Sequence, residues 1–264
     1  MPAMNNLRRM FNPKTIALVG ATERDGSIGR TIVENLLSSR NVDVRPVNIS
    51  AGSVCGIEAC PRIGMISRHV DLALVATPAR TVPFVVEECG MSGVSGVVVV
   101  SGGFGEMGEE GKKLQSRIKD IGKRYSMRVL GAGSAGFARP PTGLNATFLK
   151  SAISPGNIAF LSQNAGLCSA IVDWAANAGI GFSMVASLGS MIDVDLADLI
   201  DFLADDYATK SILIYMESVG SAKRFVSAAR AVAGRSVTRS LSPLPPRTTI
   251  CSRSKSRSFT RRRA

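Results

Sequence analysis

Glycines near the start of the chain stand where a protein can bind a phosphate. Gly20 ends an apolar run, and Gly26 and Gly29 lie on either side of Ser27, just before an amphipathic segment. A strand that turns through glycine into a helix points free backbone N–H groups and the helix N-terminus at an anion. The spacing is neither a strict G-x-G-x-x-G nor a Walker loop. It predicts a phosphorylated cofactor, and a tight turn without a ligand is the alternative.

The residues at the end of the next apolar run distinguish a nicotinamide cofactor from other phosphorylated cofactors. A nicotinamide-binding domain places an acid there, about 20 residues after the glycines, where it binds the adenosine ribose. Here the run 42–50 ends in Asn48, Ile49 and Ser50, and none of these carries a carboxylate. This end of the run disfavours an NAD(P)-binding oxidoreductase, which we keep as an alternative function.

Charge is distributed unevenly over the 264 residues. The formal net charge is +12, but residues 235–264 hold nine basic residues and no acid. The other residues, 23 basic and 20 acidic, have a net charge of +3. A tail rich in Arg and Ser can bind nucleic acid through its charge, but Phe259 is its one aromatic residue, so base stacking would add little. We therefore do not expect a nucleic-acid partner.

The remaining composition indicates a cytoplasmic protein. Apolar residues make up 45% of the chain, which is enough for a core, yet the longest apolar runs have only the length of strands. The N-terminus lacks the long apolar segment of a secretory signal. The five cysteines form no C-x-x-C pair and have no histidine partners. We expect reduced thiols, no metal site and no membrane span.

Apolar runs and amphipathic segments alternate along the first half of the chain. The expected strands are 15–20, 42–48, 71–76, 94–100 and 127–131, and the expected helices are 28–38, 80–90 and 108–125. Short apolar strands of this kind are typical of a parallel sheet that is covered on both faces. The alternation therefore predicts a doubly wound α/β domain over residues 1–135.

A stretch rich in Gly and Pro interrupts this alternation, and we expect a linker at residues 136–155. Strands are then expected at 157–161, 182–188 and 211–216, with helices at 165–178, 194–204 and 220–233. This predicts an incomplete second α/β domain over 156–233, whose three strands leave an open sheet edge that favours self-association. Residues 234–264 have no periodicity, seven Ser and three Pro, and are expected to form a disordered basic tail.

Eight motifs between Leu7 and Ala233 together resemble those of one protein family. They are I-A-L-V-G-A-T-E-R-D-G-S-I-G (16–29), V-D-L-A-L-V-A-T-P-A (70–79), S-G-G-F-G-E-M-G-E-E-G (101–111), G-L-N-A-T-F (143–148), L-S-Q-N-A (161–165), I-V-D-W-A (171–175), A-S-L-G-S-M-I-D-V-D (186–195) and R-F-V-S-A-A-R (224–230). The chain resembles the ADP-forming acyl-CoA synthetases, relatives of the succinyl-CoA synthetase α subunit. Within that family it most resembles the N-terminal region of bacterial protein lysine acetyltransferases, which carry a fused GNAT domain.

The resemblance implies a Rossmann-like CoA-binding domain followed by a flavodoxin-like, succinyl-CoA synthetase-like domain, with CoA or acyl-CoA as the cofactor. ATP and ADP belong only to complete family members. Carried over by motif, the cofactor-binding residues are Gly20, Ala21, Thr22, Ser27, Asn48, Ser50, Thr77, Pro78, Ser101 and Gly102. These residues fall at the carboxyl edge of the expected parallel sheet, where folds of this kind bind ligands.

The sequence departs from the family at three places. Ser50 stands where the family usually carries a Lys, so recognition of the ribose phosphate of CoA loses a cation. The loop after the fifth expected strand reads Gly131-Ala132-Gly133 in place of G-P-N. Family ligases pass phosphate through a histidine of the second domain, whereas the one histidine here, His69, precedes the third expected strand of the first domain. We interpret His69 as a surface residue.

The second domain keeps only the remnant of the family's phosphate site. Ser162, Gln163 and Asn164 match the start of a helix, where backbone N–H groups can bind an anion. Asp201 matches an acid that meets the family's phosphohistidine, and an exposed acid on an amphipathic helix is an equal interpretation. No residue is therefore assigned a catalytic role.

We expect the chain to bind CoA or acyl-CoA without being catalytic by itself, as a region of a synthetase-like protein or of a lysine acetyltransferase. The family pattern stops after Ala233, which we interpret as a frameshift or truncation. An ATP-grasp or acetyltransferase domain would then be supplied elsewhere. The main alternative is an active α-type ligase subunit that needs an ATP-grasp partner.

Overall fold

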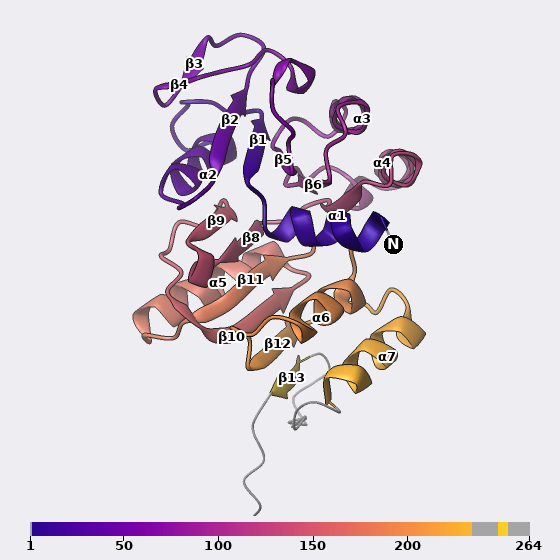
Figure 1. Ribbon diagram of the computed structural model, residues 1–264. Coiled ribbons are helices and arrows are strands. Elements are labelled where there is room, and N and C mark those ends of the chain that lie inside the picture. The colour runs from indigo at the N-terminus through magenta and orange to yellow at the C-terminus, as the bar shows by residue number, and fades with distance from the viewer. Residues whose placement is uncertain (1, 234–247, 253–264) are drawn as a thin grey trace, which may run out of the picture.

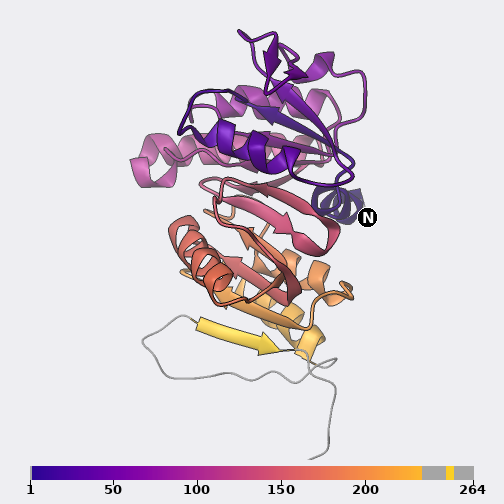
Figure 2. The ribbon, with the colours of Figure 1, turned by 90° about the vertical axis from the view of Figure 1, so that its left-hand side faces the viewer.

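The computed structural model describes residues 2–233 and 248–252, which form two stacked α/β domains (Figure 1, Figure 2). The first domain holds a five-stranded sheet in the order β2-β1-β5-β6-β7, and every neighbouring pair is parallel. Its strands are β1 (Thr15–Val19), β2 (Asp43–Val47), β5 (Leu72–Val75), β6 (Gly96–Val99) and β7 (Arg128–Gly131). The five strands expected from the sequence are therefore confirmed, each slightly shorter than predicted.

Both faces of this sheet are buried. Alternate residues of a strand point to opposite faces. In β1, Ala17 and Val19 share an apolar cluster with side chains of α3 (Val82–Met91) and α4 (Glu109–Arg124). Ile16 and Leu18 share another cluster with side chains of α2 (Ile28–Leu37). This burial is the reason that the three inner strands β1, β5 and β6 are nearly continuous apolar runs in the sequence.

Short elements complete the first domain. After β2 the chain forms a hairpin of β3 (Ser53–Val54) and β4 (Ile57–Glu58), followed by a 3-10 helix at Ile63–Met65. A second 3-10 helix, Gly105–Met107, precedes α4. These pieces lie in the loops that leave the carboxyl ends of β2 and β6, so they border the same edge of the sheet.

The second domain holds a six-stranded sheet in the order β13-β12-β10-β11-β8-β9. The three central strands β12, β10 and β11 are parallel, and β13, β8 and β9 pair antiparallel to their neighbours. The strands are β8 (Gly136–Arg139), β9 (Leu144–Thr147), β10 (Pro155–Ser162), β11 (Phe182–Ser187), β12 (Ser211–Tyr215) and β13 (Thr248–Ser252). The helices are α5 (Ala165–Asn177), α6 (Leu196–Ala204) and α7 (Ala222–Ala233). The three strands and three helices expected here are confirmed.

The sheet nevertheless extends beyond the three strands that were predicted. The segment 136–155, expected to be a linker, contains β8 and β9, and β8 pairs with β11. Its Gly and Pro residues form the turn between the two strands of this hairpin: a 3-10 turn at Pro140–Thr142 is followed by Gly143, which adopts a φ of +75°. Within the expected tail, residues 248–252 form β13 against β12. The other residues after Ala233 lie outside the described residues.

Helix α1 (Pro2–Phe11) joins the two domains into one core (Figure 1). Leu7, Met10 and Phe11 on this helix are fully buried. The centre of the Phe11 ring lies 4.8 Å from that of Phe137 on β8 and 5.1 Å from that of Phe202 on α6. One apolar cluster therefore runs from the first sheet through α1 into the second domain.

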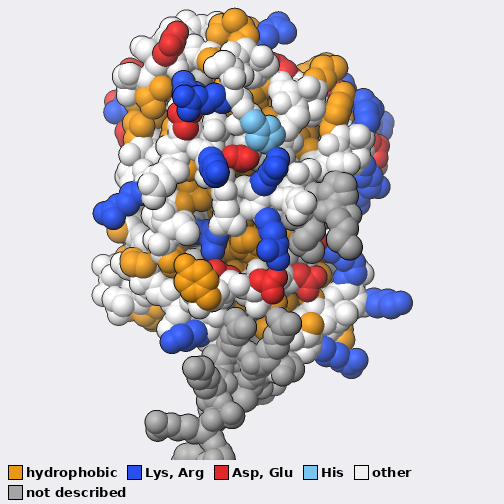
Figure 3. All heavy atoms as spheres, viewed as in Figure 1, with side chains coloured by type: hydrophobic (Ala, Val, Ile, Leu, Met, Phe, Trp, Pro, Cys, Tyr) orange, Lys and Arg blue, Asp and Glu red, His pale blue; other side chains and the backbone are white. Residues whose placement is uncertain are grey.

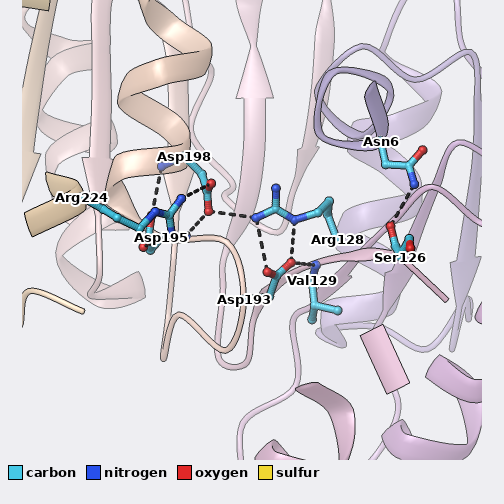
Figure 4. Close-up of polar contacts among 8 residues, drawn as sticks. All are labelled: Asn6, Ser126, Arg128, Val129, Asp193, Asp195, Asp198 and Arg224. Atoms are coloured by element: carbon cyan, nitrogen blue, oxygen red, sulfur yellow. Dashed lines mark hydrogen bonds and ion pairs between the residues drawn. The ribbon is translucent and has the colours of Figure 1, made fainter. Parts of the chain in front are cut away.

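Charged side chains link the same two domains (Figure 4). Arg128 on β7 donates hydrogen bonds to Asp193 at 2.7 Å and to Asp198 on α6 at 2.8 Å. Arg224 on α7 donates to the other oxygen of Asp198 at 2.7 Å and to Asp195, the N-cap of α6, at 2.8 Å. The side chains of Arg128 and Asp198 are only 11% and 9% exposed. Each of the two has a second ion-pair partner, Asp193 for Arg128 and Arg224 for Asp198, so the buried charges compensate one another within a network.

The charged surface is mixed in sign. On the face viewed in Figure 3, Lys and Arg side chains lie among Asp and Glu side chains over both domains. This agrees with the net charge of +3 outside residues 235–264. No helix in the described part of the chain is long and apolar enough to cross a membrane.

Replacing Phe11 with Ala should destabilise both domains together. Because its ring is buried between β8 and α6, we expect the free energy of unfolding to fall by about 3–5 kcal/mol. Urea unfolding can be followed by circular dichroism and by Trp174, the one tryptophan of the chain, on α5. The control is Phe84→Ala, which should cost about 1 kcal/mol or less because that ring is 62% exposed. Equal losses from both variants would contradict the role given to α1.

Candidate functional site

A cavity of about 570 Å³ lies at the carboxyl edge of the first sheet. The strand order reverses beside β1, which has β2 on one side and β5 on the other, so the cavity occupies the switch point of the fold. Four segments line it: Val19 and Gly20; Val47, Asn48 and Ile49; Pro61, Arg62 and Ile63; and Thr77, Pro78, Thr81, Phe84, Val85 and Glu88. Four of the predicted cofactor-binding residues, Gly20, Asn48, Thr77 and Pro78, therefore come together here.

The turn after β1 depends on contacts that only glycine permits. Gly20 has a φ of +91°, and a Cβ atom there would lie 2.8 Å from the carbonyl oxygen of Ala76. A Cβ atom at Gly29, in the first turn of α2, would overlap the carbonyl oxygen of Gly20. Ser27 is the N-cap of α2 and accepts a hydrogen bond from Arg30 N at 3.3 Å. The helix therefore begins directly against the turn that borders the cavity.

Asn48 fastens the loop after β2 to the loop after β1. Its Nδ2 donates to the carbonyl oxygen of Ala21 at 2.7 Å. Its Oδ1 accepts from the N–H groups of Ser50 and the following residue, at 2.8 and 3.0 Å. Thr22 Oγ1 likewise accepts from a backbone N–H two residues later, at 3.2 Å. Ala21, Thr22 and Ser50 thus stabilise the loops around the cavity and do not line it.

The last two predicted residues follow β6. Ser101 Oγ donates to the carbonyl oxygen of Thr77, which joins the ends of β5 and β6. Beyond Gly102, the loop closes where Gly103 N donates to Glu106 Oε1 at 2.5 Å. Hydrogen bonds from its own backbone N–H and from that of Gly103 lower the pKa of Glu106. Neither Ser101 nor Gly102 lines the cavity, but Ser101 holds a residue that does.

Sequence reasoning did not assign the other ten residues of the lining to the site, and four of these stand out by exposure or charge. The large apolar side chains of Ile49 and Phe84 are 80% and 62% exposed, and Arg62 and Glu88 are the charged residues of the lining. The guanidinium of Arg117 on α4 lies 4.6 Å from the centre of the Phe84 ring. Exposed residues in irregular loops and on the outer faces of helices have no periodic signal, so only the fold reveals that these line one cavity.

The residues predicted as a phosphate-site remnant organise the start of α5. Gln163 Oε1 accepts from the N–H groups of Glu217 and Ser218 at 2.6 and 2.8 Å, and its Nε2 donates to Ser218 O at 2.6 Å. Asn164 is the N-cap and accepts from a backbone N–H three residues later at 2.9 Å. Ser162 Oγ donates to the carbonyl oxygen of Asn164 at 2.8 Å. The predicted helix start is confirmed, and these side chains are engaged with the protein itself.

No hydrogen bond or ion pair given for the described residues joins Asp201 or His69 to that helix start. Asp201 is exposed on α6, where partial burial and the nearby carboxylate of Asp198 raise its pKa. His69 Nε2 lies 3.6 Å from Asp71 Oδ1, and the histidine side chain is 48% exposed. Because His69 precedes β5, it lies at the amino edge of the sheet, opposite the cavity. It is a surface histidine ahead of a strand, as predicted.

Cys55, Cys60, Cys89 and Cys168 are free thiols. Burial raises the pKa of Cys168 to about 12 and raises that of Cys89 as well. Both thiols are therefore protonated and unreactive at neutral pH. Within residues 2–233 and 248–252, no group of three or more His, Cys, Asp or Glu side chains could hold a metal ion.

Two family models match the chain, one for each domain. Residues 14–140 match the CoA binding domain, which spans the whole first sheet and its cavity. Residues 155–237 match the succinyl-CoA ligase like flavodoxin domain, which begins at β10. The first domain is therefore a CoA-binding domain, as the resemblance implied.

Curated relatives give the same assignment. The α subunit of ADP-forming acetate–CoA ligase I from Pyrococcus furiosus is 40% identical over 232 residues, which cover 86% of this chain and 50% of the relative. ADP-forming acetate–CoA ligase I from Archaeoglobus fulgidus is 39% identical over 229 residues, 87% of this chain and 33% of the relative. The chain thus spans about half the length or less of these relatives. They do not support the closer resemblance to lysine acetyltransferases, which stays a prediction.

Solved structures agree with the fold of both domains. A Pyrococcus horikoshii protein superposes with a TM-score of 0.84 at 38% identity, over 86% of this chain and 52% of that one. The dinucleotide-forming acetyl-coenzyme A synthetase 1 of Candidatus Korarchaeum cryptofilum, in complex with phosphate and ADP, superposes with a TM-score of 0.83 at 35% identity, over 87% and 50% of the two chains. The chain therefore belongs to the ADP-forming acyl-CoA synthetase family, of which it carries the CoA-binding domain and the succinyl-CoA ligase-like flavodoxin domain.

Proposed function

We propose that this chain binds CoA or an acyl-CoA across the carboxyl edge of its first sheet, as the α-type part of an ADP-forming acyl-CoA synthetase. The observation that carries the proposal is the cavity at the switch point, bordered by the glycine turn and the start of α2. Doubly wound sheets bind their ligands at this point. When bound, CoA supplies the thiol that carries the acyl group as a thioester.

The residues of the cavity suit this cofactor. The turn at Gly20 and the N-terminus of α2 offer backbone N–H groups and a positive helix end to a pyrophosphate. Thr77 Oγ1 is buried and has no hydrogen-bond partner among the described residues, so a ligand that reaches this wall can satisfy it. Apolar side chains such as Val47 and Val85 complete the lining and suit the less polar arm of CoA.

The phosphate-dependent step is proposed to need a partner. Family ligases pass phosphate through a histidine of the second domain, and the one histidine of this chain lies at the amino edge of the first. We infer that the chain holds the thioester while an ATP-grasp partner supplies the nucleotide chemistry. The relative from Pyrococcus furiosus is itself named as an α subunit, which supports a division of this kind.

An NAD(P)-binding oxidoreductase fits the cavity less well. Both polar atoms of the Asn48 side chain, at the end of β2, are bound to backbone groups. The one acid of the lining, Glu88, lies on α3 and not at the end of β2. A nicotinamide cofactor would therefore lack the carboxylate that usually binds its ribose hydroxyls.

The chain should bind CoA in preference to NAD. The end of β2 carries no carboxylate for the NAD ribose, whereas the turn and the helix start serve any pyrophosphate, so we expect CoA to bind at least about tenfold more tightly. Isothermal titration calorimetry with each ligand measures the two dissociation constants. Tighter binding of NAD would reject the proposed function.

Gly20→Val should weaken CoA binding by at least about tenfold. The new side chain would force a positive φ on a β-branched residue and would press against the backbone carbonyl of Ala76, so the turn must move. Gly52→Ala is the matched control, because its Cβ atom would meet nothing within 4 Å. Calorimetry on both variants should separate them, after circular dichroism has shown that each is folded. Unchanged affinity in a folded Gly20→Val protein would place the cofactor elsewhere.

The chain by itself should form no phosphoenzyme. No histidine lies in its second domain, so incubation with γ-labelled ATP, or with labelled phosphate and acetyl-CoA, should leave it unlabelled. The readout is acid-labile label that stays on the protein after gel filtration. Label on the wild-type chain would contradict the proposal, and its loss in His69→Asn would assign the label to His69.

A further inference from the structure

Arg62 is the one cation in the lining of the cavity. The lining contains a single acid as well, Glu88, whose Oε1 accepts from Gly64 N at 3.4 Å. The Arg62 side chain takes part in no ion pair or hydrogen bond that the structure gives for the described residues. Arg30 and Arg45 in the same domain differ, because both are paired with carboxylates. Arg62 therefore presents an uncompensated positive charge at the edge of the cavity.

The backbone holds Arg62 in a defined place. Two residues earlier, Cys60 N donates to Pro46 O and Cys60 O accepts from Asn48 N, both at 3.0 Å, which ties this segment to the outer side of β2. The residue that follows, Ile63, is buried in the core under the sheet. Arg62 O also accepts from Met65 N at 3.1 Å in the 3-10 helix. An exposed guanidinium on a fixed backbone suits recognition of a ligand, because only the side chain must be ordered on binding.

The position of Arg62 separates it from the glycine turn. The turn follows β1, whereas the segment that carries Arg62 runs along the far side of β2. Two strand spacings correspond to about 10 Å between these two places. The turn and the start of α2 are suited to one phosphate group of a ligand, and Arg62 is suited to a second, separate one. Ser50, in the loop directly after β2, carries no charge.

CoA carries two separate phosphate groups that match these two places. Its pyrophosphate links the pantetheine arm to the nucleotide, and a phosphate monoester stands separately on the ribose. The exposed side chains of Ile49 and Phe84 provide apolar surface for the flat adenine in the same cavity. A guanidinium can form paired, charge-assisted hydrogen bonds with a phosphate monoester.

We propose that Arg62 binds the ribose phosphate monoester of CoA and so makes the cavity discriminate between CoA and its dephosphorylated form. The inference rests on the proposed function, because it assumes that CoA occupies this cavity. It assigns to a loop after β2 the cationic contact that the end of β2 itself lacks.

The test compares Arg62→Met with Arg68→Met, using CoA and 3′-dephospho-CoA as ligands in calorimetry. Arg68 lies six residues further on, is 68% exposed and does not line the cavity; its guanidinium lies 3.7 Å from Asp43 at the start of β2, so its variant removes the same charge from the opposite edge of the sheet. We expect Arg62→Met to weaken CoA binding by about 10- to 100-fold and to leave the binding of 3′-dephospho-CoA unchanged. Arg68→Met should bind both ligands like the wild-type chain. The preference of the wild-type chain for CoA should also decrease as salt is raised.

The outcomes distinguish the two proposals. If the wild-type chain binds CoA and Arg62→Met weakens both ligands equally, or neither, the role of Arg62 is rejected and the CoA site stands. If the wild-type chain binds neither ligand, both proposals fail. Equal thermal unfolding of the two variants checks that the comparison concerns binding, as expected for two exposed side chains.

Discussion

The packing of α1 between the two domains is the interaction on which the rest of the structure depends. Phe11 contacts aromatic rings of β8 and α6, while Leu7 and Met10 are buried beside it. Because one face of the first sheet shares its core with the second domain, neither domain buries its apolar surface alone. The Arg128–Asp198 contact adds a directional link at the same junction. The relative position of the two carboxyl edges therefore follows from side chains far apart in sequence.

At the cavity of the first domain, the main structural constraint is the close contact between backbone segments. Gly29 touches the carbonyl of Gly20, and Gly20 touches the end of β5, so helix, turn and neighbouring strand cannot separate to admit larger residues. Asn48 then ties the loop after β2 to this turn. Several residues that resemble cofactor ligands of the family thus form the rigid wall of the cavity. Such a wall keeps backbone N–H groups oriented before the ligand arrives, which reduces the ordering cost of binding.

The cavity and the one histidine of the chain lie at opposite edges of the first sheet, the cavity at the carboxyl edge and the histidine at the amino edge. In the second domain, the side chains at the start of α5 are engaged in capping and loop contacts.

The sequence by itself determined the alternation of strands and helices, the glycine turn and the family, because periodic burial and turn geometry are local properties of a chain. It did not predict α1, although Leu7, Met10 and Phe11 have helical spacing, since nothing local shows what such a short segment packs against. It read β8 and β9 as a linker because Gly and Pro punctuate a hairpin as they punctuate a loop. Arg62 joined the site only through the fold: strand order and two hydrogen bonds of Cys60 bring it to the cavity. Contacts between such distant residues arise from packing, which no local pattern contains.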